Sequence, residues 1–431
     1  MTNKNCNRTK VKGLVIAFLV SFTLSAVVCP CECAASMWSM TYGGTGADNG
    51  WGDLFQTSDG GYVVSGDTES FGAGGTDFWL VKIDADGNME WNMTYGGTGI
   101  DTHTFMCQTS DGGYALVGET ESFGAGDKDF WLVKIDADGN MEWNMTYGGT
   151  GSETLPSLCQ TSDGGYAVAG CTTSFGAGDQ DGWLVKTDAD GNMEWNMTYG
   201  GTSLDQTYLV FATPDGGYAM GGTTMSFGAG GLDLWLVKTD AAGNMQWNKT
   251  YGGIGIDFGM HLIQTLDGGY AILGFTLSFG VGGGDCWLVK TDSDGNMLWN
   301  KTYGETGLDC GVHVLQTVDG GYATVGWTSG NGQDAWLFKT DAAGVMQWNQ
   351  TYGGTEDDQG WSLIETTDGG FALAGNTYSF GAGDQDFYVV KTDELGVVPE
   401  GLTVGVMLLL STVAAIVGIR YLHKRPKWKR W

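Results

Sequence analysis

Three histidines and a tryptophan lie where the repeated units of this sequence differ from one another, in the first predicted strand of their units. His261 and His313 hold equivalent places in neighbouring units, whereas Trp51 and His103 belong to two others. Two adjacent imidazoles can bind a metal ion or a polar ligand. We therefore treat Trp51, His103, His261 and His313 as candidate ligand-binding residues, with a purely structural role as the alternative.

Acidic residues recur in two loops of each unit, and both loops are expected on the same face of the fold. Their paired oxygens are the ligands that Ca²⁺ prefers. Aspartate at a turn or a strand entry also accepts hydrogen bonds from its own backbone, which is the competing, structural interpretation. No cofactor is required, and the candidate calcium ligands are Asp101, Asp129, Asp257, Asp285, Asp309 and Asp334.

The stretch WNMTYGGTGID at 91–101 combines several motifs that recur along the chain. Its G-G-T-G-I-D segment lacks the tandem nonapeptides of a calcium roll, and no helix or basic residue follows to make a phosphate loop. Its N-M-T segment is a glycosylation sequon, although W-N-x-T-Y is also simply a good strand. The candidate glycosylation sites are Asn92, Asn144, Asn196, Asn248, Asn300 and Asn349.

Tryptophans at 38, 91, 143, 195, 247, 299 and 348 mark a repeat of about 52 residues. The unit at 101–149 reads as four short strands joined by a D-G-G hairpin, the loop S-F-G-A-G-D-K-D and an A-D-G turn, and the other units follow the same order. Four antiparallel strands in each of seven units predict an all-β, seven-bladed β-propeller over residues 37–396.

The last unit lacks its Trp-bearing fourth strand, whereas the first unit is preceded by an unpaired M-W-S-M-T-Y. The N-terminal strand around Trp38 is therefore predicted to lie beside the strand around Tyr388 and to close the ring. A lysine in each third strand, surrounded by many carboxylates, predicts a repeated structural ion pair. The five cysteines of this region, which do not recur at one position in all units, are interpreted as apolar core residues without disulfides.

The runs W-L-V-K-x-D, followed by a turn, a glycine and x-x-x-W, resemble the blade signature of quinoprotein-type propellers. This resemblance covers about a third of each unit and implies a fold more than an activity. The segment D-A-D-G-N-M-E-W at 188–195 is similar to the Asp-box of sialidase propellers, but its glycine comes one place early and Asp188 replaces the serine. Sialidases bind a substrate carboxylate with arginines, and residues 38–396 contain none.

The two ends predict export and anchoring. Residues 1–35 have the basic start, apolar run and small residues of a signal peptide, and 402–419 form an uncharged run long enough for a transmembrane helix. The basic tail 420–431 is expected in the cytoplasm, which leaves the N-terminus and the propeller outside. The layout resembles that of prokaryotic, in particular archaeal, cell-surface proteins. V-V-P-E-G at 397–401 resembles the motif of tripartite sorting signals that a sortase-like enzyme cuts, with a permanent anchor as the alternative.

Residues 38–396 hold 48 acidic residues against ten lysines, a net charge near −38. Such a surface repels nucleic acid and anionic lipid. We therefore predict a non-enzymatic binding, adhesion or envelope-scaffold protein of the cell surface, whose partners are proteins or glycans and whose C-terminal helix lies in the membrane. The alternative is an extracellular enzyme, either a hydrolase or lyase acting on glycans or a quinoprotein-type dehydrogenase.

Overall fold

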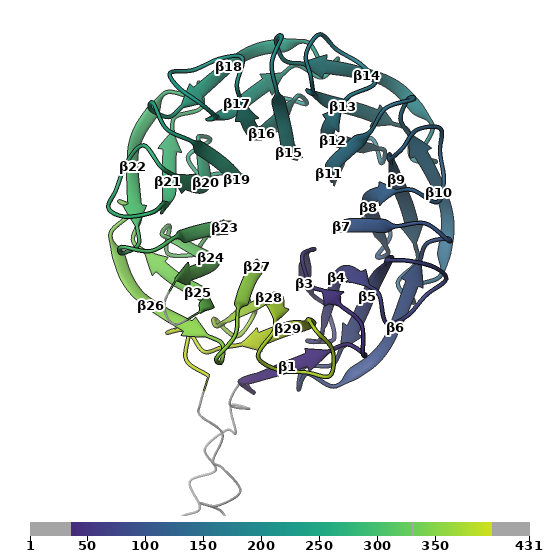
Figure 1. Cartoon of the computed structure of the whole chain (residues 1–431), viewed down its shortest axis with the longest axis vertical. Helices are drawn as coiled ribbons and strands as arrows, with labels where there is room; N and C mark the ends of the chain where they lie inside the picture. The colour runs from purple at the N-terminus through teal and green to yellow at the C-terminus, as the bar shows by residue number, and fades with distance from the viewer. Residues whose placement is uncertain (1–35, 330–331, 399–431) are drawn as a thin grey trace, which may run out of the picture. The chain divides into compact units, whose positions relative to one another are not determined.

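The computed structural model describes residues 36–329 and 332–398, and there the chain forms seven antiparallel sheets arranged around one axis (Figure 1). The predicted all-β, seven-bladed propeller is confirmed. The predicted signal peptide 1–35, the predicted transmembrane helix 402–419, the tail 420–431 and most of the predicted sorting motif 397–401 lie outside these ranges. Within them no helix is long and apolar enough to cross a membrane.

Six of the seven blades place their strands in chain order from the axis outward, and in the last blade the N-terminal strand is outermost. The innermost strands are β2 (Asp48–Asn49) with β3 (Leu54–Gln56), β7 (Asp101–Gln108), β11 (Glu153–Gln160), β15 (Asp205–Ala212), β19 (Asp257–Gln264), β23 (Asp309–Gln316) and β27 (Asp358–Glu365). The second strands are β4 (Tyr62–Thr68), β8 (Tyr114–Thr120), β12 (Tyr166–Thr172), β16 (Tyr218–Thr224), β20 (Tyr270–Thr276), β24 (Tyr322–Ser329) and β28 (Phe371–Thr377).

The outer half of each blade follows the same order. The third strands are β5 (Asp77–Ile83), β9 (Asp129–Ile135), β13 (Asp181–Thr187), β17 (Asp233–Thr239), β21 (Asp285–Thr291), β25 (Gln333–Thr340) and β29 (Asp386–Lys391). The outermost strands are β6 (Met89–Tyr95), β10 (Met141–Tyr147), β14 (Met193–Tyr199), β18 (Met245–Tyr251), β22 (Met297–Tyr303), β26 (Met346–Tyr352) and β1 (Trp38–Tyr42). We number the blades 1 to 7 by their innermost strands.

Burial explains the residue types of these strands. Strands such as β5, D-F-W-L-V-K-I, are buried along their whole length because a neighbouring blade covers each face. They are accordingly rich in aromatic and β-branched residues, which fit a pleated, packed surface. The outermost strand β6 lies at the edge of its sheet and pairs only with β5. Most of its residues are therefore exposed or half-buried.

Blade 1 departs from the predicted four continuous strands. It has one residue more between Asp48 and Gln56 than blade 2 has between Asp101 and Gln108. The innermost strand is therefore split into β2 and β3, which both pair with β4. The connecting segment 50–53 reads G-W-G-D and leaves the sheet, which brings Trp51 and Asp53 towards the axis.

The apolar cores lie between blades rather than within them. Val63 and Phe78 of blade 1 share a core with Leu116 and Trp131 of blade 2. The rings of Phe78 and Trp131 lie 4.9 Å apart between centroids. The same arrangement recurs at the other six junctions of the described ring. Each blade is therefore stabilised only when it contacts both neighbouring blades.

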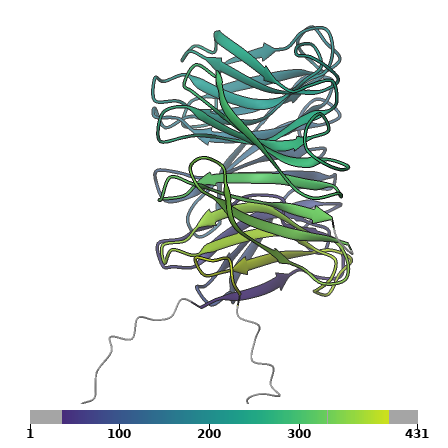
Figure 2. The ribbon, with the colours of Figure 1, turned by 90° about the vertical axis from the view of Figure 1, so that its left-hand side faces the viewer.

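Strand β1 closes the ring, as the sequence predicts. It pairs antiparallel with β29, with Thr41 opposite Tyr388, and Figure 2 shows β1 beside the C-terminal strands. Trp38 packs edge-to-face on Tyr62 of blade 1 at 5.9 Å, and its indole N–H donates to the carbonyl of Ala85 at 3.0 Å. One strand thus belongs to the sheet of blade 7 and to the core of blade 1.

Two polar contacts are repeated around the described ring, one between neighbouring blades and one within each blade. The hydroxyl of each outermost-strand tyrosine donates to a glycine carbonyl of the next blade, for example Tyr95 to Gly139 at 2.6 Å. The predicted lysine ion pairs are confirmed. Each buried third-strand lysine contacts the aspartate of the D-G-G hairpin in its own blade. The pairs are Lys82–Asp59, Lys134–Asp111, Lys186–Asp163, Lys238–Asp215, Lys290–Asp267, Lys339–Asp319 and Lys391–Asp368.

The cysteines of the described ring are all free, as predicted. Cys171, Cys286 and Cys310 are buried, and burial raises the pKa of the Cys171 thiol to about 12. They behave as small apolar side chains.

Substitution of Trp38 by alanine should destabilise the whole ring. Trp38 is only 7% exposed, so its loss removes apolar contacts at the closing junction. We expect the free energy of unfolding to fall by about 3–5 kcal/mol in urea unfolding. Met40→Ala, on the solvent side of the same strand, should change it by less than about 0.5 kcal/mol. Equal effects of the two variants would show that β1 does not close the ring.

The hairpin aspartates should make the protein sensitive to acid. Hydrogen bonding by Thr161, and next the ammonium of Lys186, lower the pKa of Asp163 to about 2. A carboxyl whose folded pKa lies below its unfolded value of about 3.9 stabilises the fold fully above that value and loses the effect towards pH 2. We expect urea midpoints to fall between about pH 4 and pH 2. At pH 7 the urea midpoint of Asp163→Asn should be lower than that of the unsubstituted protein. At pH 2 the two midpoints should nearly coincide. A difference that persists at pH 2 would contradict this account.

Candidate ligand-binding site

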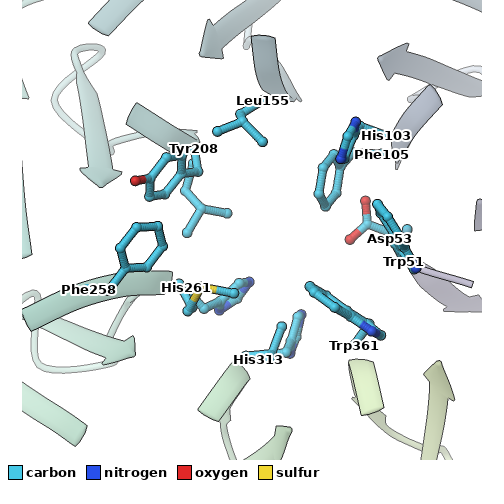
Figure 3. A pocket seen from close by; sticks show the side chains of 14 residues that line it. Trp51, Asp53, His103, Phe105, Leu155, Tyr208, Phe258, His261, His313 and Trp361 are labelled. Atoms are coloured by element: carbon cyan, nitrogen blue, oxygen red, sulfur yellow. The ribbon is translucent and has the colours of Figure 1, made fainter. Parts of the chain in front are cut away.

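The innermost strands surround one cavity on the axis of the ring, with a volume of about 290 Å³ (Figure 3). Trp51, His103, His261 and His313 all line it, so the structure places the four predicted channel residues in one wall. That they bind a ligand stays a prediction. The volume suits a single residue-sized group rather than an extended chain.

Aromatic rings form most of the cavity wall. Trp51 stacks on Trp361 with ring centroids 5.8 Å apart and lies 5.1 Å from the His103 ring. Across the cavity Tyr208 stacks on Phe258 at 5.3 Å. These residues come from blades 1, 2, 4, 5 and 7, so the wall has no sevenfold symmetry.

Asp53 is the one carboxylate in the cavity wall of the described ring. One of its oxygens accepts a hydrogen bond from the Met106 amide at 2.8 Å, and Figure 3 shows the carboxylate facing the interior. Burial raises the pKa of the Asp53 carboxyl to about 6, against the smaller lowering effect of that hydrogen bond. At neutral pH the Asp53 carboxyl is therefore ionised in most molecules, although burial disfavours the charged form.

The two adjacent histidines are in ring-to-ring contact, with centroids 3.9 Å apart. The Val314 amide donates to Nδ1 of His261 at 3.3 Å, so that nitrogen serves as an acceptor. Burial lowers the pKa of His261 to about 4 and lowers that of His313 well below its usual value. Both are neutral at pH 7. In the part of the chain that the structure describes, no three His, Cys, Asp or Glu side chains are grouped as metal ligands.

The second strands shape the wall from behind. In several blades the middle residue of the G-x-T segment reaches the innermost strand of the next blade, as at Asp67, Glu119 and Cys171. Asp67 accepts from the His103 amide at 3.0 Å and from the Thr102 hydroxyl at 2.6 Å, and Glu119 accepts from the Leu155 amide at 2.8 Å. His103 and Leu155 both have φ near +57°, a strained conformation that these buried acceptors hold in place.

Sequence reasoning missed Asp53, Tyr208, Phe258 and Trp361. A signal was available, because these residues stand at non-repeating positions of the innermost strands, as the four predicted residues do. Asp53 was hidden by the one-residue insertion, which shifts blade 1 against the repeat. The stacking of Trp51 on Trp361 depends on ring closure and could not be read from either unit alone.

The acidic residues form one pair at each blade junction, and only Asp285 and Asp309 of the six candidates pair with each other. The others pair with acids outside the predicted set. Asp101 faces Asp77, Asp129 faces Glu153, Asp257 faces Asp233, and Asp334 faces Asp358. Calcium binding at these places stays a prediction.

Hydrogen-bond donors of the protein already occupy most of these carboxylates. Asp101 accepts from the Gly97 amide at 2.8 Å, from the Ser122 hydroxyl at 2.7 Å and from the Thr120 hydroxyl. Asp129 accepts from the amides of its own glycine-rich loop. This pattern is the structural role of aspartate at a turn.

The acid pairs also explain the first glycine of the Y-G-G motif. A Cβ at Gly148 would lie 1.7 Å from an oxygen of Asp129 and 2.4 Å from one of Glu153. The two carboxylates therefore fill the space that any other residue would need. In WNMTYGGTGID it is Gly96 that serves this close approach.

The six sequon asparagines lie on the outermost strands, exposed except for the half-buried Asn248. Each carbonyl oxygen accepts the indole N–H of a buried third-strand tryptophan, for example Asn92 from Trp79 at 3.1 Å. The same bond recurs at Asn144, Asn196, Asn248, Asn300 and Asn349. The motif thus has a structural role in six of the seven blades, and glycosylation stays a prediction.

The described part of the chain is therefore a seven-bladed β-propeller with an asymmetric, largely aromatic cavity on its axis. No protein-family model matches the chain. One curated relative, the regulatory protein FlaEY of Caulobacter vibrioides, is 25% identical over 217 residues. The match covers 45% of this chain and 22% of the relative, so the chain spans about a fifth of that protein's length.

Solved structures share the fold at low identity. A chain of the mitotic checkpoint complex matches with a TM-score of 0.54 and 10% identity, over 91% of this chain and all of that one. The polysaccharide lyase Uly1 matches with a TM-score of 0.49 and 12% identity, over 82% and 91% of the two chains. The α-L-arabinanase of Penicillium chrysogenum complexed with arabinobiose gives 0.46 and 12%, over 83% and 99%. At these identities the likeness concerns the β-propeller fold alone.

Calcium should have little effect on the stability of the ring. Because N–H and O–H donors already bind Asp101 and its counterparts, we expect thermal midpoints in excess Ca²⁺ and in EDTA to agree within about 2 °C. A larger rise with Ca²⁺ that Asp285→Asn abolishes would establish a calcium site at the Asp285–Asp309 pair. Asp86→Asn, an exposed turn residue, serves as the control.

Proposed function

We propose that this chain is an exported, surface-anchored propeller that acts by binding a protein or glycan partner, and that the axial cavity receives one group of that partner. One observation carries the proposal. The residues that break the repeat converge on this cavity, whereas the turns and outer strands repeat from blade to blade. Variation confined to one concave, aromatic place is typical of a recognition site.

The composition of the cavity favours binding over catalysis. A glycoside hydrolase of the usual kind needs two carboxyl groups facing each other across the substrate. The cavity wall of the described ring offers Asp53 alone, and its paired histidines His261 and His313 are neutral. A single carboxyl can hold a ligand or accept one proton, but it does not form an acid–base pair.

A quinone cofactor does not fit the same place. Quinone cofactors of the pyrroloquinoline class carry several carboxylates, which require cationic partners. Among the residues that the structure describes, no lysine or arginine lines the cavity, and its one charged residue is acidic. The resemblance to quinoprotein-type blades therefore extends to strand order and not to this site.

The outer location of the propeller follows from the chain ends. The basic start and apolar run of residues 1–35, and the apolar segment 402–419 with its basic tail, support export and anchoring with the ring outside. Seven glycine-rich loops and the net charge near −38 over residues 38–396 keep such a surface soluble. An adhesion or envelope-scaffold role is consistent with this arrangement.

An array of glycans and peptides, probed with the full chain in detergent, tests the proposal. We expect at least one ligand to bind without product release, and Trp361→Ala to weaken its binding by at least about tenfold, because the substitution removes a cavity wall. Phe71→Ala, an exposed aromatic residue of the outer loops, should leave the affinity within about twofold.

Two results would contradict the proposal. If Phe71→Ala abolished binding while Trp361→Ala did not, the loop face would be the binding site. If soluble product accumulated from a glycan and Asp53→Asn stopped its release, the chain would be an enzyme, and the single carboxylate would be its catalytic group.

A further inference from the structure

We propose that the axial cavity recognises an organic ammonium group, held by the carboxylate of Asp53 and enclosed by aromatic rings. This inference rests on the proposed function and names the chemistry of the group that the cavity takes. The ammonium belongs either to a small free cation or to a lysine side chain, and the same recognition serves both.

Aromatic rings that suit a cation form much of the cavity wall. The carbon-rich faces and edges of Trp51, Trp361, Tyr208 and Phe258 surround the cavity. A cation held against such rings is attracted by their electron-rich faces, most strongly by tryptophan, and the attraction grows when water is excluded. An alkylated ammonium also has an apolar surface, which suits a wall of this kind.

The charge of the cavity wall also favours a cation. Asp53 is the only charged side chain in the cavity wall of the described ring, and it lies beside the Trp51–Trp361 stack (Figure 3). The described ring contains ten lysines and no arginine. Seven of those lysines are paired with hairpin aspartates away from the cavity. The potential at the cavity is therefore negative, and a bound cation would compensate the buried carboxylate.

A sugar ring fits less well, because its hydroxyls need several hydrogen-bond partners. The Tyr208 hydroxyl already donates to Gln206 at 2.7 Å, and Nδ1 of His261 is occupied by the Val314 amide. The indole nitrogens of Trp51 and Trp361 are buried without partners, and Figure 3 shows them on the ends of the rings farther from the cavity. The polar groups that remain in the described cavity wall are the Asp53 carboxylate and imidazole nitrogens, among them the buried, unpartnered Nδ1 atoms of His103 and His313.

Isothermal titration of the full chain in detergent tests this inference, with tetramethylammonium, choline, the uncharged tert-butyl analogue of choline and a methyl glucoside as probes. We expect the two cations to bind, and the uncharged analogue and the glucoside to bind at least about tenfold more weakly. A lysine-containing and a trimethyl-lysine-containing peptide distinguish a protein side chain from a free cation as the source.

Three variants connect the binding to the cavity. Asp53→Asn and Trp361→Ala should each weaken choline binding by at least about tenfold. Asp86→Asn removes the same charge from an exposed turn and should leave the affinity within about twofold. Thermal unfolding of each variant shows whether it is folded. Asp53→Asn keeps an oxygen that can accept from the Met106 amide.

Each outcome has a definite meaning. Equal affinity for choline and its uncharged analogue, or unchanged binding by Asp53→Asn, would overturn the ammonium inference. Binding of the glucoside that Trp361→Ala abolishes would also overturn it but would leave the proposed function intact. If no probe, glycan or peptide depended on Trp361, both proposals would fall.

Discussion

The seven apolar cores of the described ring lie between neighbouring blades, so every blade depends on the two beside it. The second and third strands are buried on both faces, which means that an isolated blade would expose most of its aromatic side chains. A row of such blades has two unsatisfied ends, and only closure removes them. Strand β1 provides the closure by joining the sheet of blade 7 while Trp38 packs on Tyr62 of blade 1.

Two populations of residues follow from this constraint. The repeated residues build the blades and their junctions. Acid pairs lie against glycine at the junctions, whereas lysines bonded to hairpin aspartates and asparagines bonded to buried tryptophans connect strands within a blade. They are polar groups whose partners are supplied by the protein itself, which is why they need no ligand to explain them. The residues that differ between units gather instead where the innermost strands face the cavity, and Trp51, His261 and Trp361 are not members of the apolar cores between blades. The cavity can therefore vary without loss of the ring.

Much of the fold could be predicted because it is local and repeated. Hairpin turns, strand order and the buried third strands follow from residue types a few positions apart, and the repeat multiplies each signal. The missing fourth strand of the last unit and the orphan strand at the start predict closure by simple counting. Blade 1 escaped this reasoning, since one inserted residue moves G-W-G-D out of its sheet and breaks the first strand into β2 and β3.

The sequence by itself determined the seven blades, their strands, the closing strand, the lysine ion pairs and the convergence of four variable residues on the axis. Only the tertiary structure decided which acids face each other and that Asp53 lies beside Trp51 and Trp361. The physical reason is distance along the chain. Trp51 and Trp361 become neighbours because the ring closes between blades 7 and 1. The acid partners are fixed by how tightly neighbouring loops approach over a glycine, which no spacing within one unit records.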